Sequence, residues 1–434
     1  MNILSLLNRN KTLRNIGIYM FSTSLNQAVP FLLLPLLTIY LSPGDYGYIN
    51  SFSAILVLSN AIVGGGIVNN IAKYYFNKDQ QYMKKMMGNL YFLLLCISLL
   101  AFVITLIITR FVNITFIPPA LFIAIPFISF FFISFEFLKE TKKLRKQASK
   151  FALFTFSEMA FNISISLILI IALLWNWKGR VSGITFSYIT FGIFAILYFL
   201  YKNEIKFSID KKMIKSILTL SIPLLPSVVS IMIIRKSGVL FVDAFLGKNE
   251  AGLYGIALNL STLILFISMP FVNVWIPYIY KKLSKINQNT FRDLRGSLFI
   301  FTCFIFSVCL IFSLISGVIL KIMTTDAFLP AKVFIPWLAF GFAFWALYSM
   351  YMPFYIHYEK QKYLAIIAVS SAVFNVITNY ILILKIGATG IAISFFISNF
   401  FTFLFVFFWV RTFIKLPVFP DFKRIGLIFK DLTR

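Results

Sequence analysis

Two adjacent cations, Arg235 and Lys236, stand inside an apolar stretch that is long enough to cross a membrane. The stretch runs from Ile217 to Phe245 and reads ILTLSIPLLPSVVSIMIIRKSGVLFVDAF. A charged side chain near the centre of a bilayer costs about 2.5–3.5 kcal/mol on insertion scales. Intramembrane charges usually face the interior of a helix bundle or a water-filled path, so the pair predicts a site for an anionic substrate. The competing interpretation is that both side chains reach an interface or pair with a local acid such as Asp243.

Arginine suits a phosphate group because its planar guanidinium donates two parallel hydrogen bonds. Arg235 is therefore the first candidate for holding the anion, and Lys236 is the second. Amide side chains on other apolar stretches are candidates for further contacts with a polar substrate. They are Asn26, Gln27, Asn60 and Asn259. For each amide the competing interpretation is a hydrogen bond between neighbouring helices, worth about 0.6 kcal/mol on average.

Glu158 is the acid most clearly inside an apolar stretch, eight residues after Lys150 and so about 12 Å deep at the helical rise. It predicts a site for proton or sodium coupling, with pairing to a cation or a serine as the alternative. Asp243 is the second candidate for ion coupling, although a local ion pair competes there. Three cations at the inner ends of spans are candidates for gathering headgroups: Lys73, Arg145 and Lys281. Most cations at such positions follow the ordinary excess of Lys and Arg in inner loops.

Composition places these residues in a membrane protein. Of the 434 residues 60% are hydrophobic and 12% are charged, and the mean hydropathy is +0.90, which excludes an ordinary soluble protein. The net charge of +26 does not indicate nucleic acid, because the cations lie in short segments between apolar runs. The cysteines (Cys96, Cys303 and Cys309) all lie within apolar runs, so neither a disulfide framework nor a metal site is predicted. No P-loop pattern occurs, and no cofactor is predicted.

Apolar runs of about 20 residues each match the hydrocarbon thickness of a bilayer. The chain is therefore predicted to be all-α and polytopic, with about twelve transmembrane helices. The predicted spans are 15–40, 46–72, 86–109, 114–136, 152–175, 182–201, 217–244, 252–279, 297–320, 331–356, 363–384 and 389–413.

The distribution of Lys and Arg predicts which ends of these spans face the cytoplasm. With the N-terminus in the cytoplasm, 31 Lys and Arg residues lie on the inner side and 7 lie in outer loops. By the positive-inside rule both termini are predicted to be cytoplasmic.

The chain also contains a weak internal repeat. A shift of 205 residues lays Leu41–Gly47 over Leu246–Gly252, and Tyr75 over Tyr280. Near the end of each half, Phe161–Asn162 resembles Phe374–Asn375, and Gly183–Ile184 resembles Gly390–Ile391. Six spans are an even number, so the two copies would enter the membrane from the same side as parallel repeats.

This repeat predicts two parallel six-helix lobes around a central cavity. Arg235 and Lys236 would lie on the first helix of the second lobe, near mid-membrane. The predicted parts are the lobe 1–201, a cytoplasmic linker 202–216, the lobe 217–414 and a tail 415–434. The tail is predicted to form a basic amphipathic helix at the inner leaflet, in contact with membrane lipid.

Four segments carry a resemblance to a known family: LSPGDYGYINSF (41–52), GGGIVNNIAKYYF (64–76), FLGKNEAGLYGIALNLS (245–261) and FNVITNYILILKIGATGIAIS (374–394). With the two-times-six design, they make the chain resemble the polysaccharide flippases of the Wzx type. These belong to the multidrug/oligosaccharidyl-lipid/polysaccharide exporter superfamily, abbreviated MOP.

The resemblance implies transport of undecaprenyl-pyrophosphate-linked oligosaccharide repeat units by alternating access, from the cytoplasmic to the outer leaflet of the bacterial inner membrane. It implies a role in the biosynthesis of a surface polysaccharide, such as the O-antigen of lipopolysaccharide or a capsule. A polysaccharide polymerase and a chain-length regulator are the further partners that it implies.

Two other functions compete with this interpretation. A cation-coupled multidrug exporter of the same superfamily would usually carry acids in its cavity. Span 15–40 contains no acid, whereas span 217–244 contains two cations, which favours an anionic substrate. A membrane polysaccharide polymerase would need a sizeable outer loop with catalytic residues, and every predicted outer loop is short. The chain is therefore predicted to be a transporter and not an enzyme.

Overall fold

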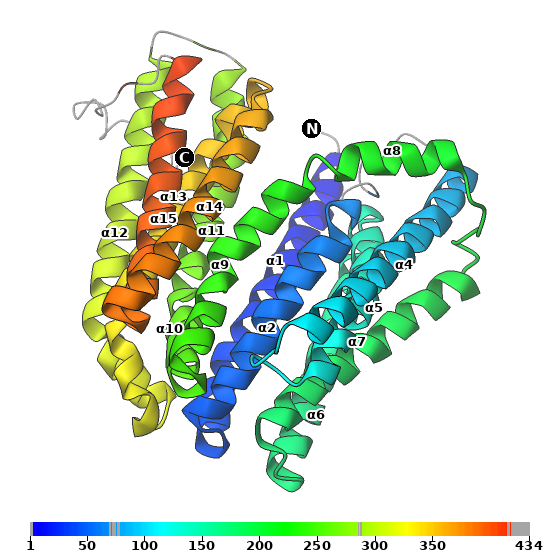
Figure 1. Ribbon diagram of the computed structural model, residues 1–434. Coiled ribbons are helices and arrows are strands. Elements are labelled where there is room, and N and C mark those ends of the chain that lie inside the picture. Colours follow the sequence, from blue (N-terminus) through cyan, green and yellow to red (C-terminus); the bar gives the residue numbers. More distant parts are fainter. Residues whose placement is uncertain are drawn as a thin grey trace. The chain divides into compact units, whose positions relative to one another are not determined.

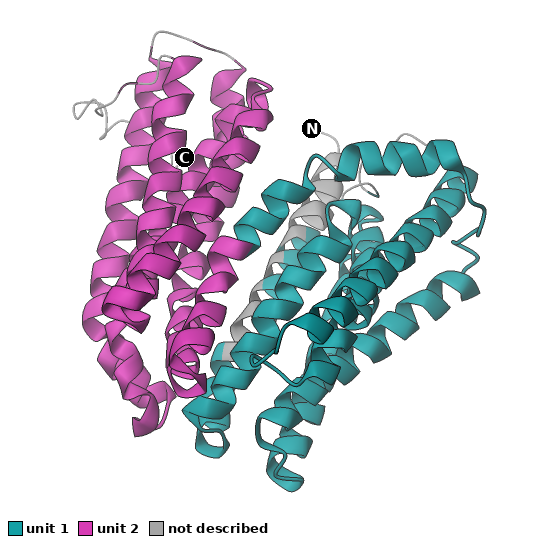
Figure 2. Cartoon of the chain, in the orientation of Figure 1, with its two compact units in different colours: residues 1–232 teal, residues 233–434 magenta. Residues whose placement is uncertain are grey.

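The computed structural model describes residues 3–68, 71, 75, 79–284, 286, 289–414 and 417. Within helix α1, only the backbone is described for residues 3–13, 16, 20, 24 and 26–30. The described chain is built from helices (Figure 1) and clusters into two compact units, residues 1–232 and 233–434 (Figure 2). The predicted tail 415–434 lies outside the described residues apart from residue 417. The predicted lobe boundaries, and the cavity between the lobes, stay predictions.

Unit 1 contains the helices up to α8 and the first turns of α9. Helix α5 lies at its centre, where it contacts α2, α4, α6 and α7. The helices are α1 (Ile3–Tyr40), α2 (Pro43–Gly64), α4 (Gln80–Phe111), α5 (Pro119–Leu144), α6 (Ala148–Leu167), the π-helix η1 (Ile168–Ala172), α7 (Asn176–Tyr201) and α8 (Lys211–Ser221).

Unit 2 contains the rest of α9 and the helices that follow. Helix α13 lies at its centre, where it contacts α10, α11, α12, α14 and α15. The helices are α9 (Leu225–Leu246), α10 (Lys248–Ser261), α11 (Leu263–Leu283), α12 (Thr290–Met323), the 3-10 helix η2 (Asp326–Val333), α13 (Ile335–His357), α14 (Gln361–Ile386), α15 (Ala388–Trp409) and η3 (Val410–Thr412).

The same pattern of neighbours occurs in both units. In unit 1 the central helix α5 packs against α4 and α7, and α6 packs against α7. In unit 2 the central helix α13 packs against α12 and α15, and α14 packs against α15. The two units therefore share one arrangement of helices, as expected for a duplicated sequence.

Eleven helical segments in the described chain are long and apolar enough to cross a membrane. They match eleven of the twelve predicted spans in order, which confirms the all-α polytopic fold. The remaining prediction, 15–40, falls on α1, where only part of the side chains is described. The chain is a multi-pass membrane protein.

The predicted span 217–244 is wrong at its start. Residues up to Ser221 belong to α8, a separate amphipathic helix that lies across the end of α4 (Figure 1). The break falls at Ile222–Leu224, before α9 begins at Leu225. Pro223 and Pro226 lack the backbone N–H that a continuous helix would use to bond four residues back. The membrane helix that carries the cation pair is therefore Leu225–Leu246.

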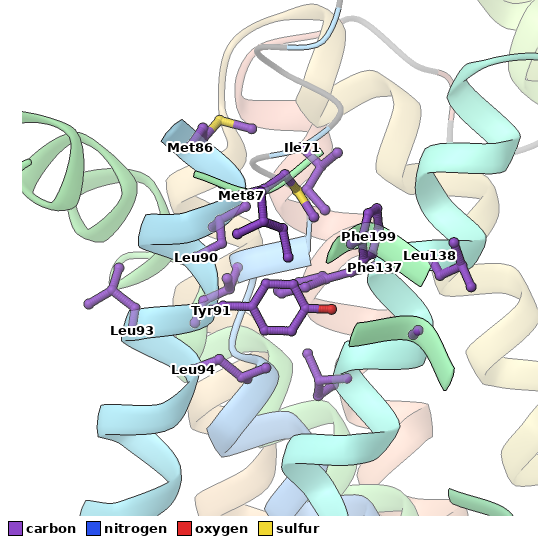
Figure 3. Close-up of a cluster of buried hydrophobic side chains, with 14 of the residues drawn as sticks. Ile71, Met86, Met87, Leu90, Tyr91, Leu93, Leu94, Phe137, Leu138 and Phe199 are labelled. Carbon is purple, nitrogen blue, oxygen red and sulfur yellow. The ribbon is translucent and has the colours of Figure 1, made fainter. Parts of the chain in front are cut away.

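An apolar cluster fills one end of unit 1. The ring of Tyr91 meets Phe137 edge-on at 5.4 Å and Phe199 at 6.2 Å between centroids, joining α4, α5 and α7 (Figure 3). Phe135 and Leu138 of α5 belong to the same buried cluster. On α5, Glu136 and Lys139 each lie about 150° around the helix from the middle of the face formed by Phe137 and Leu138, so they turn away from this cluster.

The repeated segment LSPGDYG forms the start of α2. Ser42 is the N-cap, and its hydroxyl accepts from the Asp45 N–H at 3.2 Å. The Asp45 carboxylate in turn accepts from the Ser42 N–H at 3.0 Å, which completes a capping box. At the matching place in unit 2, Gly247 precedes α10 with φ +85, a conformation that glycine adopts without strain. Each unit thus begins its second membrane segment at a fixed point.

Candidate functional site

The cation pair lies at the middle of α9. Arg235 is ten residues after the helix begins at Leu225, so it lies roughly 15 Å from either end at the helical rise. Arg235 and Lys236 are both half-buried. Within the described part of the chain, neither side chain has a hydrogen-bond or ion-pair partner. Their charges are therefore available to a ligand.

Ser237 and Gly238 fix the rotation of α9 about its axis. The Ser237 hydroxyl donates to Asn375 Oδ1 at 3.1 Å and accepts from Asn379 Nδ2 at 3.1 Å, both on α14. A Cβ added to Gly238 would lie 2.6 Å from the Tyr254 hydroxyl, so α9 also packs closely on α10. With 3.6 residues per turn, Arg235 and Lys236 lie about 110° and about 150° from the middle of this face. Both therefore project from the half of α9 that faces away from the core of unit 2.

Asp243 does not pair with the cation pair. Its carboxylate lies 2.5 Å from Lys248 Nζ, at the junction of α9 and α10. Asp243 is buried, and its charge is balanced by this lysine. The alternative in which Asp243 neutralises Arg235 or Lys236 is therefore wrong, and Asp243 as an ion-coupling residue stays a prediction.

A second polar region is a cavity of about 320 Å³ inside unit 1. Helices α2, α5, α6 and α7 supply its walls. Two carboxylates and two cations line it together with amide, hydroxyl and apolar side chains. The polar residues are Ser53, Asn60, Glu136, Lys139, Glu158, Asn162, Arg180 and Tyr188. The cavity thus brings together two residues predicted separately, Asn60 for substrate and Glu158 for ion coupling.

Hydrogen bonds between α6 and α7 fix the positions of Glu158 and Arg180 in this cavity. Glu158 is 8% exposed, and its Oε1 accepts from the Ser187 hydroxyl of α7 at 3.1 Å. One turn further on, Asn162 Oδ1 accepts from Arg180 Nη1 at 2.6 Å, and the Ser166 hydroxyl accepts from the same nitrogen at 2.8 Å. These three residues of α6 span about 12 Å of the helix. The arrangement can hold a small ion.

On the α5 side of the cavity, Glu136 and Lys139 form an ion pair of 2.5 Å. Asn60 Oδ1 of α2 is buried, and no described residue donates to it. With two acids and two bases ionised the cavity has no net charge. Loss of either carboxylate charge would therefore leave an unbalanced cation inside the unit.

Sequence reasoning missed most of these residues. Lys139 and Arg180 fall outside the predicted spans 114–136, 152–175 and 182–201, because hydropathy marks only the apolar middle of a helix. The available signal was spacing: Glu158, Asn162 and Ser166 recur every four residues on α6, so they share one face. Arg180, Ile184 and Tyr188 repeat the pattern on α7.

Other predicted residues lie elsewhere. Asn26 and Gln27 lie on α1, but their side chains are outside the described residues, as is Lys73 altogether. Asn259 is half-buried in the last turn of α10, where its backbone carbonyl accepts from the Thr262 hydroxyl at 2.6 Å. Lys281 is exposed in the last turn of α11.

Arg145, a predicted headgroup residue, lines a cavity of about 530 Å³ at the end of unit 1 that holds the apolar cluster. Its Nη1 lies 2.6 Å from the Glu204 carboxylate. Burial by itself lowers the pKa of Arg145, but Glu204 and Tyr75 outweigh it and raise the pKa above its ordinary value. Lys84 and Lys202 line the same cavity, so it stays basic although Glu204 is bound to Arg145.

No three His, Cys, Asp or Glu side chains among the described residues lie close enough together to hold a metal ion. Cys96 and Cys303 are exposed and Cys309 is buried, and all three are free thiols.

Comparison with known protein families gives one match, described as polysaccharide biosynthesis protein, over residues 12–283. A search of curated protein sequences gives no match.

Solved structures share the fold over nearly the whole chain. The lipid II flippase MurJ in an inward closed conformation aligns with a TM-score of 0.71 at 17% identity, covering 97% of this chain and 93% of its own. An inward-facing multidrug resistance transporter of the MATE family, in the MOP superfamily, aligns with a TM-score of 0.68 at 15% identity, covering 93% and 96%. An outward-facing MATE transporter aligns with a TM-score of 0.50 at 15% identity, covering 96% and 95%. These likenesses show the fold.

Proposed function

Because the chain belongs to the polysaccharide biosynthesis protein family, a family of MOP-superfamily transporters rather than enzymes, we propose that it is a flippase for lipid-linked oligosaccharides. Its substrate would be an undecaprenyl-pyrophosphate-linked repeat unit. The protein would carry this unit from the cytoplasmic to the outer leaflet of a bacterial inner membrane. A polymerase reaction would then consume the product in building a surface polysaccharide such as O-antigen or capsule.

The observation that carries this proposal is the cation pair on α9. A pyrophosphate headgroup is anionic, so moving it through a bilayer requires positive charge at depth. Arg235 and Lys236 supply that charge near the middle of a membrane helix, and no described acid neutralises them. The Arg235 guanidinium would donate two parallel hydrogen bonds to one phosphate, and Lys236 would add a point charge.

Alternating access is the proposed route. The same fold occurs in MATE transporters in inward-facing and in outward-facing conformations. The proposed orientation places both termini in the cytoplasm, since that arrangement leaves 31 of the Lys and Arg residues on the inner side. In this orientation the Arg145 cavity of unit 1 opens at the cytoplasmic side, where Lys84 and Lys202 would attract anionic headgroups.

The unit 1 cavity is the proposed site of energy coupling. Glu158 would bind a proton or a sodium ion, and Arg180 and Lys139 would balance the carboxylate when the ion leaves. Asn60 then belongs with the coupling residues, because it lines the same cavity as Glu158.

The leaflet location of lipid-linked oligosaccharide tests the proposed function. In cells that lack the protein, the lipid-linked units should accumulate on the cytoplasmic leaflet, and the wild-type protein should restore them to the outer leaflet. Arg235→Ala should fail to do so while still inserting in the membrane, and Lys321→Ala, an exposed cation in the last turn of α12, serves as the matched control. Unchanged leaflet distribution, together with altered sensitivity to cationic drugs, would instead identify a multidrug exporter.

A further inference from the structure

A cleft of about 920 Å³ lies at the end of unit 1 opposite the Arg145 cavity. The first residues of α5, the segment that joins η1 to α7, and the first turns of α7 form its walls. This volume is within the roughly 300–1,000 Å³ range of small-molecule sites. Aromatic and polar side chains are mixed in its lining: Trp175, Asn176, Trp177, Lys178, Ser182 and Thr185.

The backbone before α7 is shaped so that Trp175 is exposed at the surface of unit 1. The π-helix η1 ends at Ala172, and the Trp175 N–H bonds to the Leu169 carbonyl at 3.0 Å. On either side of Trp175, Leu174 (φ 53) and Asn176 (φ 47) adopt left-handed conformations, which are uncommon for residues other than glycine. Trp175 remains 46% exposed. π-Helical turns and left-handed residues tend to occur at functional positions.

The second tryptophan forms a fixed wall. The Trp177 ring stacks on Tyr48 of α2, with 4.5 Å between centroids and 15° between planes. Its backbone N–H points to Asp45 Oδ1 at 3.4 Å. Asp45 is itself held by the capping box with Ser42. The repeated LSPGDYG segment thus positions Trp177 as well as starting α2.

Hydrogen-bonding groups stand beside the rings. Asn176 and Ser182 contribute an amide and a hydroxyl, and Lys178 contributes a cation. The Thr185 hydroxyl is buried and has no hydrogen-bond partner among the described residues. A buried hydroxyl without a partner is uncommon, because leaving it unpaired costs about 1–3 kcal/mol. A ligand with several hydroxyl groups would supply partners to all four side chains.

We propose that this cleft binds carbohydrate, with a sugar ring stacked on Trp175 and its hydroxyl groups bonded to Asn176, Ser182 and Thr185. A pyranose has one face of C–H groups, which packs on an indole ring, and a rim of hydroxyls that requires polar neighbours. Lys178 would pair with a carboxylate on an acidic sugar. The site rests on the proposed function and orientation, which place it at the outer leaflet, where the glycan of the transported lipid would arrive.

Binding of free glycan to the purified, detergent-solubilised protein tests this site. The probe is the oligosaccharide released by mild acid from the lipid-linked intermediates of the producing cells, titrated by calorimetry. Trp175→Ala should weaken binding about tenfold, and Trp175→Phe should weaken it less because a ring remains. Trp337→Ala, which removes a 38% exposed tryptophan of α13 in unit 2, should bind as the wild type does. Equal affinity in wild type and Trp175→Ala would overturn the proposal and leave Trp175 as an interfacial anchor.

Chemical labelling tests the same site independently, without a substitution of Trp175. In a variant lacking Cys96, Cys303 and Cys309, a Ser182→Cys thiol should react with a membrane-impermeant maleimide added from outside the cell. The free oligosaccharide should slow this reaction in the purified protein. Lack of protection would overturn the carbohydrate site, even if leaflet assays confirm a flippase. Protection combined with normal transport by Arg235→Ala would instead overturn the proposed anion site and retain the carbohydrate site.

Discussion

Helix α6 of unit 1 and the matching helix α14 of unit 2 carry different kinds of side chain. In the repeat, Glu158 and Asn162 of α6 correspond to Ser371 and Asn375 of α14. In unit 1 these positions line a cavity that contains four charged side chains. In unit 2 the matching side chains are neutral: Asn375 belongs to a hydrogen-bonded network, and Ser371, one turn earlier on α14, has no hydrogen bond from a described residue. The duplicated fold therefore carries an ionisable side chain at these matching positions only in unit 1.

The unit 2 network consists of hydrogen bonds between neutral side chains. Asn375 Nδ2 donates to the Ser398 hydroxyl at 3.0 Å, and Asn379 Nδ2 donates to Asn375 Oδ1 at 3.1 Å. Ser237 of α9 joins both amides, and Thr378 and Ser394 pair at 2.6 Å. None of these groups changes charge near neutral pH, so the network holds α9 in one rotation and does not respond to protons.

This difference separates two tasks. In the proposed function the charged cavity of unit 1 would exchange an ion, whereas the neutral network of unit 2 orients the helix that carries Arg235 and Lys236. Ion binding and substrate binding would then depend on different units. The following substitutions test that separation, in order of decreasing effect.

The largest effect is expected from placing an acid in unit 2. Asn375→Asp removes the donor to Ser398 and buries a carboxyl group among neutral partners, which should lower the free energy of unfolding by about 3 kcal/mol. The matched change in unit 1, Asn162→Asp, puts a carboxylate beside Arg180 and should cost less than about 1 kcal/mol. Thermal unfolding of the two solubilised variants makes the comparison. Equal losses would contradict the distinction between the units.

Loss of the cation from the unit 1 cavity should have the next largest effect. Arg180→Ala leaves Asn162 and Ser166 without their donor and gives the cavity an excess of negative charge. The free energy of unfolding should fall by about 2 kcal/mol. Arg180→Lys, which keeps the charge, should lose less than half as much in the same thermal assay. If lysine is no better than alanine, charge balance does not stabilise this cavity.

Glu158→Gln separates coupling from folding. Glutamine can still accept from Ser187, but it leaves one cation of the cavity unbalanced, so the variant should lose some stability, although less than Arg180→Ala loses. It cannot release a proton or bind sodium as a carboxylate does. Ion-driven transport should fall about tenfold, equivalent to about 1.4 kcal/mol in the barrier. Transport of labelled lipid-linked oligosaccharide in vesicles, with and without an ion gradient, provides the measurement. Wild-type transport that persists after the gradient is collapsed would remove Glu158 from this role.

The smallest effect is expected at the equivalent position of unit 2. Ser371 is buried, and no described residue bonds its hydroxyl. Ser371→Ala should therefore change the free energy of unfolding by less than about 0.5 kcal/mol, because no hydrogen bond is lost. Transport by this variant should equal that of the wild type in the vesicle assay used for Glu158. A transport defect here would show that α14 does more than orient α9.

The fold was largely predictable from the sequence because a bilayer sets the length and apolar character of each span. The order of the spans was correct, as was the assignment of Arg235 and Lys236 to the middle of one of them. The break between α8 and α9 is missed because the apolar run is continuous across it, although Pro223 stands within the run. Backbone hydrogen bonding, rather than hydropathy, determines where that helix begins.

The site was predictable only in part. Glu158 stood out as an acid within an apolar run, but Glu136, Lys139 and Arg180 lie near helix ends and resembled loop charges. Whether such a side chain points into the helix bundle depends on the rotation of its helix about the helix axis. Tertiary packing determines that rotation. The exposed Trp175 was not predicted either, because its presentation depends on the π-helix before it and on two left-handed residues.

The most direct test of the central claim is the leaflet distribution of lipid-linked oligosaccharide in cells that contain only the Arg235→Ala variant. We expect the lipid-linked units to remain on the cytoplasmic leaflet and surface polysaccharide to be lost, while the variant is present in the membrane at the wild-type level. Outer-leaflet units and normal surface polysaccharide in that variant would contradict the assignment of Arg235 to the transported headgroup.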